Sequence, residues 1–168
     1  MFVIHSTQKG FIHIPRTAGV FIESQCTSID SFESFRPYHR SIPEELLHYK
    51  WHTRMRDPVD RFVSLFRFNQ NKSIPHHEGD FDSFIEHVSM NFEWHTRPQV
   101  SFIQEFVNLH VKVENCIVAL GGKITGVPIN QSTAEIPIIT KQQIAKIKEI
   151  YKEDVELFSK LTNFVIKG

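Results

Sequence analysis

The stretch Gly10-Phe11-Ile12-His13-Ile14-Pro15-Arg16-Thr17-Ala18-Gly19 decides the fold of this chain. Its first half is a short apolar run, rich in isoleucine, that ends at a proline, and this pattern predicts a buried strand over Gly10–Ile14. Residues 16–19 predict a tight turn, and the apolar and small residues from Ala18 to about Ser28 favour a helix. The stretch therefore predicts a strand, then a loop large enough to hold a phosphate, and then a helix.

Size and composition suit a single domain over residues 1–168. The chain is 40% hydrophobic and 23% charged, as is ordinary for a globular domain that needs no disulfide or metal to fold. Its 19 basic and 19 acidic side chains cancel, which argues against a nucleic-acid partner held by bulk positive charge. A local cluster of cations could still hold a phosphate.

Targeting features are absent from the pattern. The N-terminus lacks the long apolar segment of a signal peptide, and no window approaches the roughly 20 apolar residues of a membrane span. We therefore expect no membrane partner and a cytoplasmic location. Cys26 and Cys116 have no C-x-x-C spacing, and we interpret them as two free, partly buried thiols rather than a disulfide.

Strands and helices alternate along the rest of the chain. Tyr49–Met55 alternates between two faces and predicts a strand, and Pro58 opens a helix that runs to Asn69. Two further strands are predicted, at Ser31–His39 and His110–Glu114. Further helices are predicted at Pro43–Leu47, Phe81–Met90, Gln99–Val107, Cys116–Leu120 and Lys141 to about Leu161, with loops at Gln70–Asp80 and Thr125–Pro137. The alternation predicts an α/β domain of three layers, a central, mainly parallel sheet flanked by helices.

The loop after the first strand is one candidate binding site. A loop that enters a helix exposes free backbone N–H groups and the positive end of the helix dipole, which attract an anionic phosphate. Gly19 would let the backbone approach a ligand, and Arg16 and Thr17 add a charge and a hydroxyl. A plain strand-to-helix connection stays an alternative. The loop is not a Walker A motif, because G-x-x-x-x-G-K-[ST] is absent.

A second candidate site is the junction Arg56-Asp57-Pro58-Val59-Asp60-Arg61-Phe62-Val63-Ser64. Arg56 follows the predicted strand at its carboxyl end, where open α/β sheets bind ligands. Ser64 lies two turns along the helix, and Arg61 could pair with Asp57 at a spacing of four residues. The alternative is that Asp57 and Pro58 merely begin a helix that carries an ordinary salt bridge.

Together the two sites resemble those of carbohydrate sulfotransferases that use 3′-phosphoadenosine-5′-phosphosulfate (PAPS). Residues 12–19 resemble the family's 5′-phosphosulfate loop, usually I-P-K-T-A-G-T-S, and residues 56–64 resemble its 3′-phosphate motif, R-D-P-x-x-R-x-x-S. The likeness continues in the family's order through Phe66-Arg67-Phe68, His95-x-Arg97-Pro98-Gln99, the strand ending at Glu114, Pro128-x-Asn130-x-Ser132 and Tyr151-x-x-Asp154-x-x-Leu157-Phe158. The chain thus resembles a short, soluble member of the heparan sulfate 2-O-sulfotransferase-like, Golgi-type superfamily, with a P-loop-like fold.

The resemblance implies roles for the matching residues. Arg16 takes the place of the family's lysine, which stabilises charge on the leaving phosphate, and Arg56 and Ser64 would hold the 3′-phosphate. The 5′-phosphosulfate would be bound by the loop residues Pro15, Arg16, Thr17, Ala18, Gly19 and Val20, with backbone N–H groups offered by Thr17, Ala18 and Gly19. The reaction would yield 3′-phosphoadenosine-5′-phosphate (PAP).

The acceptor hydroxyl, on a small molecule or an oligosaccharide, needs a general base. His39 in Pro37-Tyr38-His39-Arg40 matches the place of the base in similar enzymes, and an imidazole can take a proton at neutral pH. A surface histidine of a loop is the alternative for His39. His52, His95 and Glu114 are lesser candidates, with Glu114 interpreted mainly as structural.

Departures from the family keep other functions open. Val20 and Phe21 replace two loop hydroxyls, which removes up to two hydrogen bonds of about 1.5–3 kcal/mol each. A non-catalytic protein that binds PAPS or PAP is therefore an alternative, and a P-loop nucleotide kinase is a more distant one. Residues 76–78 (His-His-Glu) and the pair His48 and His52 could suggest a metal site. We interpret them as solvated histidines, because His48 and His52 fall on the predicted strand, where residues four positions apart are distant, and sulfuryl transfer needs no metal.

Overall fold

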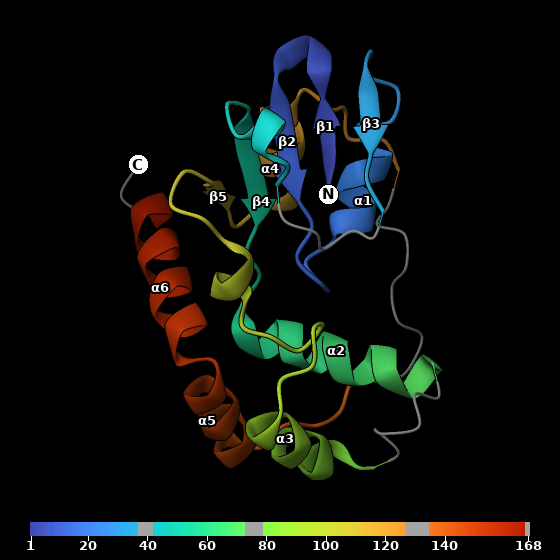
Figure 1. The fold of residues 1–168 in the computed structure, drawn as a ribbon. Coiled ribbons are helices and arrows are strands. Elements are labelled where there is room, and N and C mark those ends of the chain that lie inside the picture. Colours follow the sequence, from blue (N-terminus) through green and yellow to red (C-terminus); the bar gives the residue numbers. More distant parts are fainter. Residues whose placement is uncertain (37–41, 73–78, 127–134, 167–168) are drawn as a thin grey trace. The chain divides into compact units, whose positions relative to one another are not determined.

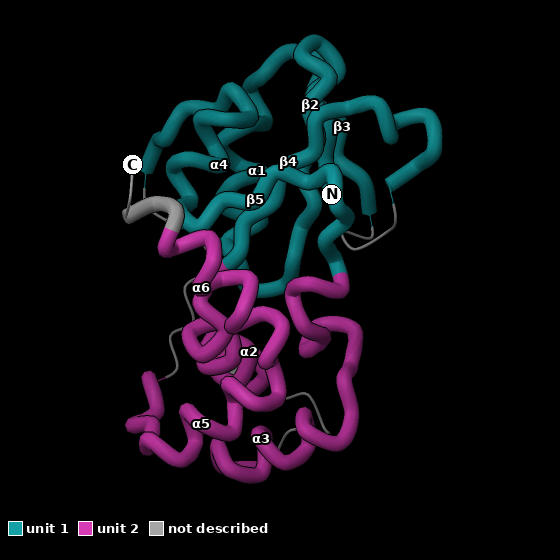
Figure 2. The backbone as a smooth tube through the Cα atoms, turned by 90° about the vertical axis from the view of Figure 1, so that its left-hand side faces the viewer, with its two compact units in different colours: residues 1–55, 102–130 teal, residues 56–101, 131–168 magenta. Residues whose placement is uncertain are grey.

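In the computed structural model of the protein, residues 1–36, 42–72, 79–126 and 135–166 are described (Figure 1). The chain divides into two units (Figure 2): unit 1 is residues 1–55 and 102–130, and unit 2 is residues 56–101 and 131–168. Each unit combines two separate stretches of the chain and has its own hydrophobic clusters. The single domain that the length predicts stays a prediction.

Unit 1 is built on a mixed sheet. Within the described residues the strand order is β3-β1-β2-β4-β5. The strands are β1 (Phe2–Ile4), β2 (Lys9–Ile12), β3 (Phe32–Ser34), β4 (Lys50–Arg54) and β5 (Asn108–His110). Strands β2, β4 and β5 are parallel, whereas β1 is antiparallel to both β2 and β3. The predicted α/β class is confirmed, and the sheet is mixed.

Strand β1 is the element that the sequence prediction lacks. It is only three residues long, and residues 5–8 alone separate it from β2. So short a connection allows only antiparallel pairing, because parallel strands need a crossover of a dozen or more residues. Gln8 closes the hairpin in the left-handed region, with φ of 50°. The hairpin therefore makes the sheet mixed.

Alternate residues of the strands feed two separate apolar clusters in unit 1, because successive side chains of a strand point to opposite faces. One cluster joins β1 and β2 to the helices α1 (Gly19–Ser24) and α4 (Val113–Leu120). The other contains Met1, Val3, Ile12, Leu46, Trp51 and Val107. Trp51 also explains Gly10, since a Cβ atom there would lie 2.5 Å from the indole ring.

Unit 2 is helical. Its α-helices are α2 (Pro58–Lys72), α3 (Phe81–Met90), α5 (Lys141–Ile150) and α6 (Lys152–Ile166). The rings of Phe62, Phe66, Phe81 and Phe84 pack against each other, with centroids 4.9–5.6 Å apart. Asp80 caps α3, and a capping box of Thr140 and Gln143 begins α5. All four rings belong to the hydrophobic cluster of unit 2.

Several predicted elements differ from the structure. The helix predicted at Gln99–Val107 is wrong, because only a 3₁₀ turn, Gln99–Phe102, forms. The strand predicted at His110–Glu114 is also misplaced: β5 ends at His110, and α4 begins at Val113. The long helix predicted over residues 141–161 is two helices that meet at Tyr151, whose φ of −109° and ψ of 36° are not helical.

Smaller differences concern element ends. The helix predicted to reach Ser28 ends at Ser24, and Pro43–Leu47 contains a 3₁₀ turn at Glu44–Leu46. The strand predicted at Ser31–His39 is formed only at Phe32–Ser34, and its last three residues lie outside the described part of the chain.

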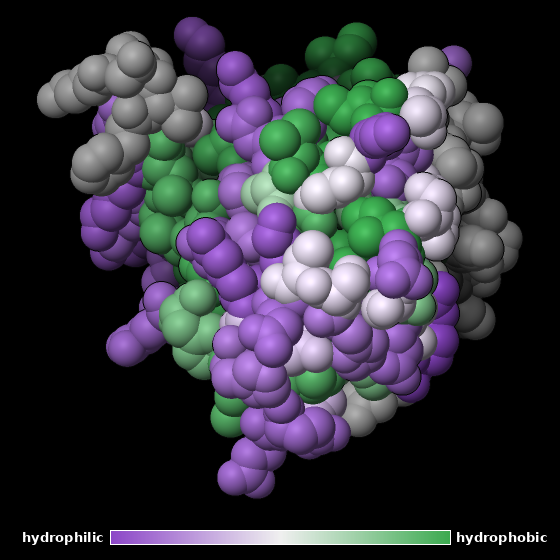
Figure 3. Space-filling view, turned by 90° about the horizontal axis from the view of Figure 1, so that it is seen from above, coloured by the Kyte–Doolittle hydropathy of each residue, from purple (hydrophilic) through white to green (hydrophobic). Residues whose placement is uncertain are grey.

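Surface features are ordinary in the described residues. None of their helices is both long and apolar enough to cross a membrane. On the face seen in Figure 3, hydrophobic side chains lie in several separate groups between hydrophilic ones. Cys26 and Cys116 are free, as predicted, and both are buried.

Candidate functional site

The loop between β2 and α1 has an alternating backbone conformation. Arg16 has φ of 64° and Ala18 has φ of 66°, whereas Thr17 between them is not in the positive-φ region. Successive residues of opposite φ turn their N–H groups toward one concave side, an arrangement that binds anions. Each non-glycine residue in the left-handed region costs about 1–3 kcal/mol. Other contacts must therefore hold this loop in shape.

Two side chains supply such contacts. Thr17 is fully buried, and its hydroxyl donates to the carbonyl of Ile14 at 2.9 Å. Arg54, the last residue of β4, donates from Nη1 to the carbonyl of Thr17 at 3.1 Å and from Nε to the carbonyl of Val111 at 3.2 Å. The Thr17 hydroxyl thus serves the loop itself.

Gly19 begins α1 where a side chain has no room. A Cβ atom at this position would lie 2.1 Å from Cδ2 and 2.4 Å from Nε2 of the buried His13 ring. The close approach at Gly19 is therefore to His13. Helix α1 has six residues, fewer than two turns, so the loop amides matter more than a helix dipole.

The two residues that depart from the family's loop have different surroundings. Phe21 is 4% exposed and belongs to the apolar cluster with Phe2, Phe11 and Ile22. Val20 is half-buried. Phe21 is therefore a core residue, and Val20 is the one of the two that a ligand at the loop could contact.

The second candidate site lies in unit 2, where the backbone of Arg56 is bonded to the side chain of Gln99. The side-chain amide of Gln99 accepts a hydrogen bond from Arg56 N–H at 3.0 Å and donates one to Arg56 C=O at 2.9 Å. Oδ1 of Asp57 accepts from the N–H groups of Val59 and Asp60, at 2.9 and 3.0 Å. Asp57 therefore caps α2. Partial burial lowers the pKa of Arg56, while the carboxylates of Asp60 and Asp57 oppose that shift.

Ser64 lies on α2 and is buried, with 8% of its surface exposed. Arg61, one turn before it, is 1% exposed and donates from Nη2 to the carbonyl of His95 at 3.1 Å. The guanidinium also lies 5.9 Å from the ring centroid of Tyr151. Burial lowers the pKa of Arg61, while Tyr151 and Asp154 raise it. Arg61 thus organises the interior of unit 2.

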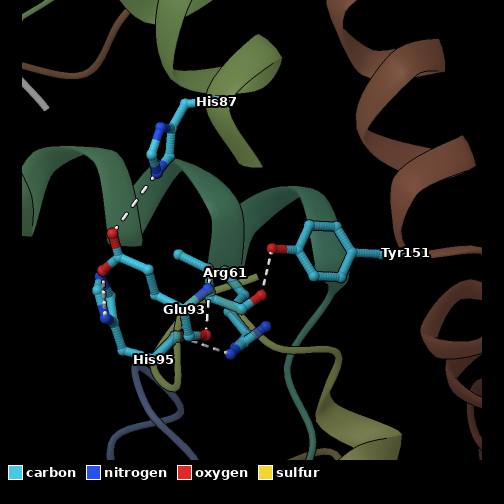
Figure 4. A network of polar contacts seen from close by, with 6 residues as sticks. Arg61, His87, Glu93, His95 and Tyr151 are labelled. Atoms are coloured by element: carbon cyan, nitrogen blue, oxygen red, sulfur yellow. Dashed lines mark hydrogen bonds and ion pairs between the residues drawn. The ribbon is translucent and has the colours of Figure 1, made fainter. Parts of the chain in front are cut away.

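Figure 4 shows how this network continues through the segment before Gln99. Tyr151 donates its hydroxyl to the carbonyl of Thr96 at 2.6 Å. The carboxylate of Glu93 lies between two imidazoles, 3.5 Å from Nε2 of His87 and 3.5 Å from Nδ1 of His95. His95, a lesser candidate for the base, is thus buried in this network.

The remaining predicted candidates have varied surroundings. His39 and residues 76–78 lie outside the described residues. His52, 3% exposed, pairs its Nδ1 with Nε2 of His110 at 3.0 Å, and their rings stack. Burial, with smaller effects from nearby charges, lowers the pKa of His52 to about 4. His48 packs instead on Tyr49.

Glu114 is exposed in the first turn of α4. No cluster of three or more histidine, cysteine, aspartate or glutamate residues suited to a metal ion occurs in the described residues.

The predicted site residues fall into two sets. Pro15 to Val20 belong to unit 1, and Arg56 and Ser64 belong to unit 2. Sequence reasoning missed Arg54 and the buried contacts of Gln99, and no local pattern could have found them, because their partners lie far away in the chain. Protein-family models, curated proteins and solved structures contain no match to this chain.

Proposed function

We propose that the protein is a sulfotransferase that moves a sulfuryl group from PAPS to a hydroxyl, on a small molecule or an oligosaccharide. The observation that carries the proposal is the loop Pro15–Gly19, where φ alternates in sign over Arg16, Thr17 and Ala18, a pattern that favours anion binding. It occurs in the stretch whose sequence resembles a phosphosulfate loop. We also propose that the protein has the three-layer, P-loop-like architecture of that family.

Hydrogen-bond donors and positive charges would hold the nucleotide at its 5′-phosphosulfate and at its 3′-phosphate. The N–H groups of Thr17, Ala18 and Gly19 and the guanidinium of Arg16 would bind the 5′-phosphosulfate, with Val20 alongside. Arg56 and Ser64 would bind the 3′-phosphate through a charge-assisted hydrogen bond and a hydroxyl. The fixed backbone of Arg56 supports this role, because a side chain on a fixed backbone has less freedom to lose on binding.

The proposed chemical step is an in-line displacement. His39 takes the proton of the acceptor hydroxyl as its oxygen forms a bond to sulfur. The bond from sulfur to the 5′-phosphate oxygen breaks, and PAP leaves with the electron pair. Arg16 and the loop amides stabilise the negative charge that develops on that phosphate. The step requires no metal.

A non-catalytic protein that binds PAPS or PAP is a second candidate function. Phe21 favours it, since its ring fills the core where the family has a loop hydroxyl. Val20 is also apolar, so at these two positions the bound phosphosulfate would find only backbone donors. For either function we propose a reducing, cytoplasmic setting, which the free thiols of Cys26 and Cys116 support.

Transfer of labelled sulfate from PAPS to a panel of hydroxyl acceptors tests the catalytic proposal. The wild-type protein should form labelled product, and His39→Ala should abolish transfer while PAP affinity stays within about twofold by calorimetry. Near-normal transfer by His39→Ala would remove His39 as the base. Tight PAP binding without transfer to any acceptor would favour the non-catalytic function.

A further inference from the structure

The side chain of Gln99 makes an unusual pair of contacts with one backbone position. Gln99 is completely buried, and its amide bonds both the N–H and the C=O of Arg56, which lies 43 residues earlier. The amide can make this pair in only one orientation, because the flipped group would face donor with donor and acceptor with acceptor. The amide thus acts toward Arg56 as a neighbouring strand would.

Gln99 is itself fixed by a second buried residue. Asp154 at the start of α6 is completely buried, and its carboxylate accepts from Gln99 N–H at 2.8 Å and from Val100 N–H at 2.9 Å. These bonds and the charge of Arg61 favour the ionised carboxylate, whereas burial has the larger effect and raises the pKa of Asp154. One carboxylate therefore holds two consecutive amides and sets the direction of the Gln99 side chain.

On the other side of Arg56, the Asp57 cap fixes the chain at the start of α2. The backbone of Arg56 therefore cannot rotate without breaking both bonds to Gln99. A guanidinium whose backbone is held in this way samples fewer positions. The binding of an anion to it therefore costs less conformational entropy.

We propose that Gln99 is a positioning residue that holds Arg56 ready for an anionic phosphate, and that Asp154 fixes Gln99 for this task. The identity of the phosphate rests on the proposed function. The positioning of Arg56 does not, because it concerns contacts within unit 2. A residue that only stabilised the fold would lower stability without a specific effect at Arg56.

The experiment measures two quantities in the full chain: amide hydrogen exchange at Arg56 without ligand, and PAP affinity by calorimetry. Gln99→Met removes both bonds at similar size, and Gln99→Glu keeps the acceptor for Arg56 N–H while it loses the donor. Gln143→Met is the matched control, because the half-buried Gln143 loses its side-chain bonds to Asp82 and Thr140 elsewhere in unit 2.

We expect Gln99→Met to speed exchange at Arg56 and to weaken PAP binding, each about tenfold, the scale of losing two neutral hydrogen bonds. Gln99→Glu should give smaller changes of both quantities, and Gln143→Met should give none. In an Arg56→Ala background, Gln99→Met should no longer affect PAP affinity, because coupled residues are not additive.

Unchanged exchange at Arg56 in Gln99→Met and Gln99→Glu would overturn the proposal. So would an affinity loss from Gln99→Met that persists in full without the Arg56 side chain. A wild-type protein that binds no PAP would refute the proposed function instead. Faster exchange at Arg56 in the Gln99 variants would then still support the positioning role, and unchanged exchange would still overturn it.

Discussion

The guanidinium of Arg54 donates a hydrogen bond to the carbonyl oxygen of Thr17, with Nη1 and the oxygen 3.1 Å apart. Its Nε donates to the carbonyl of Val111 at 3.2 Å. One planar cation at the end of β4 thus joins the loop after β2 to the residue that follows β5. Thr17 lies between two residues of positive φ, so this bond stabilises a backbone that is strained by itself.

Replacement of this cation should therefore loosen the loop. We expect Arg54→Met to weaken PAP binding by at least about tenfold, the scale of one or two charge-assisted hydrogen bonds. Arg54→Lys should recover only part of the loss, because an ammonium cannot reproduce the two-point geometry. Calorimetry checks both variants. Lys9→Met is the control, since Lys9 donates to the carbonyl of Ala119 in the same unit. Wild-type affinity in Arg54→Met would contradict this role.

A methyl group at Gly19 should clash with the ring of His13. Gly19→Ala is expected to lower the free energy of unfolding by about 1–3 kcal/mol, the usual cost of overpacking a core. In the background of His13→Ala the same change should cost much less, because the atoms that it meets are gone. Urea unfolding of the four proteins measures this coupling. Equal cost in both backgrounds would show that His13 is not the reason for the glycine.

The two apolar residues of the loop should respond in opposite ways to a restored hydroxyl. Phe21→Ser should lose about 3–5 kcal/mol of stability, because it empties a filled position in the core. Val20→Thr should change stability by less than about 1 kcal/mol. It should also tighten PAP binding, since one more donor faces the phosphate. Urea unfolding and calorimetry test the pair, and a Phe21→Ser protein as stable as the wild type would contradict its place in the core.

Acid should destabilise unit 1 through His52. Burial and the charges of His110, Lys50 and Lys9 lower the pKa of His52 from 6.5 to about 4. Between these values the unfolded chain binds more protons than the folded protein, so stability falls as the pH drops from about 6.5 toward 4. The contribution is fully present above pH 6.5, and its loss should be on the order of 1–3 kcal/mol.

Urea unfolding at pH 7.5, 6 and 5 checks this effect. The slope of stability against pH should flatten in His52→Gln, which cannot take up the proton. His48→Gln serves as the control, because it makes the same substitution at an exposed histidine just before β4. Identical slopes in the wild type and His52→Gln would show that another group titrates.

The sequence predicts those parts of the fold that local patterns determine. Alternation identifies β4, the helical stripe with Phe62 and Phe66 identifies α2, and Thr140 with Gln143 marks the start of α5. β1 escapes prediction because three apolar residues carry no measurable period. The helix predicted at Gln99–Val107 is wrong, since only the 3₁₀ turn Gln99–Phe102 forms, and the first amide of that turn bonds to Asp154, 55 residues away in the chain.

In the candidate site, too, some residues can be predicted from the local sequence and others cannot. The loop and Arg56 are visible as motifs, because their residue types are suited to phosphate in a short stretch of chain. Arg54 and Gln99 are not, because each acts on backbone groups of a residue at least 37 positions away. No composition or spacing encodes such a contact, and only the folded chain brings the partners together.

The most direct test of the central claim compares nucleotides by calorimetry on the wild-type protein and on Arg56→Ala. We expect PAP to bind the wild type selectively over ATP and AMP. We also expect Arg56→Ala to weaken PAP binding by about 10–100-fold, the scale of a charged hydrogen bond to the 3′-phosphate. No binding of PAP, equal binding of all three nucleotides, or unchanged PAP affinity in Arg56→Ala would contradict that claim.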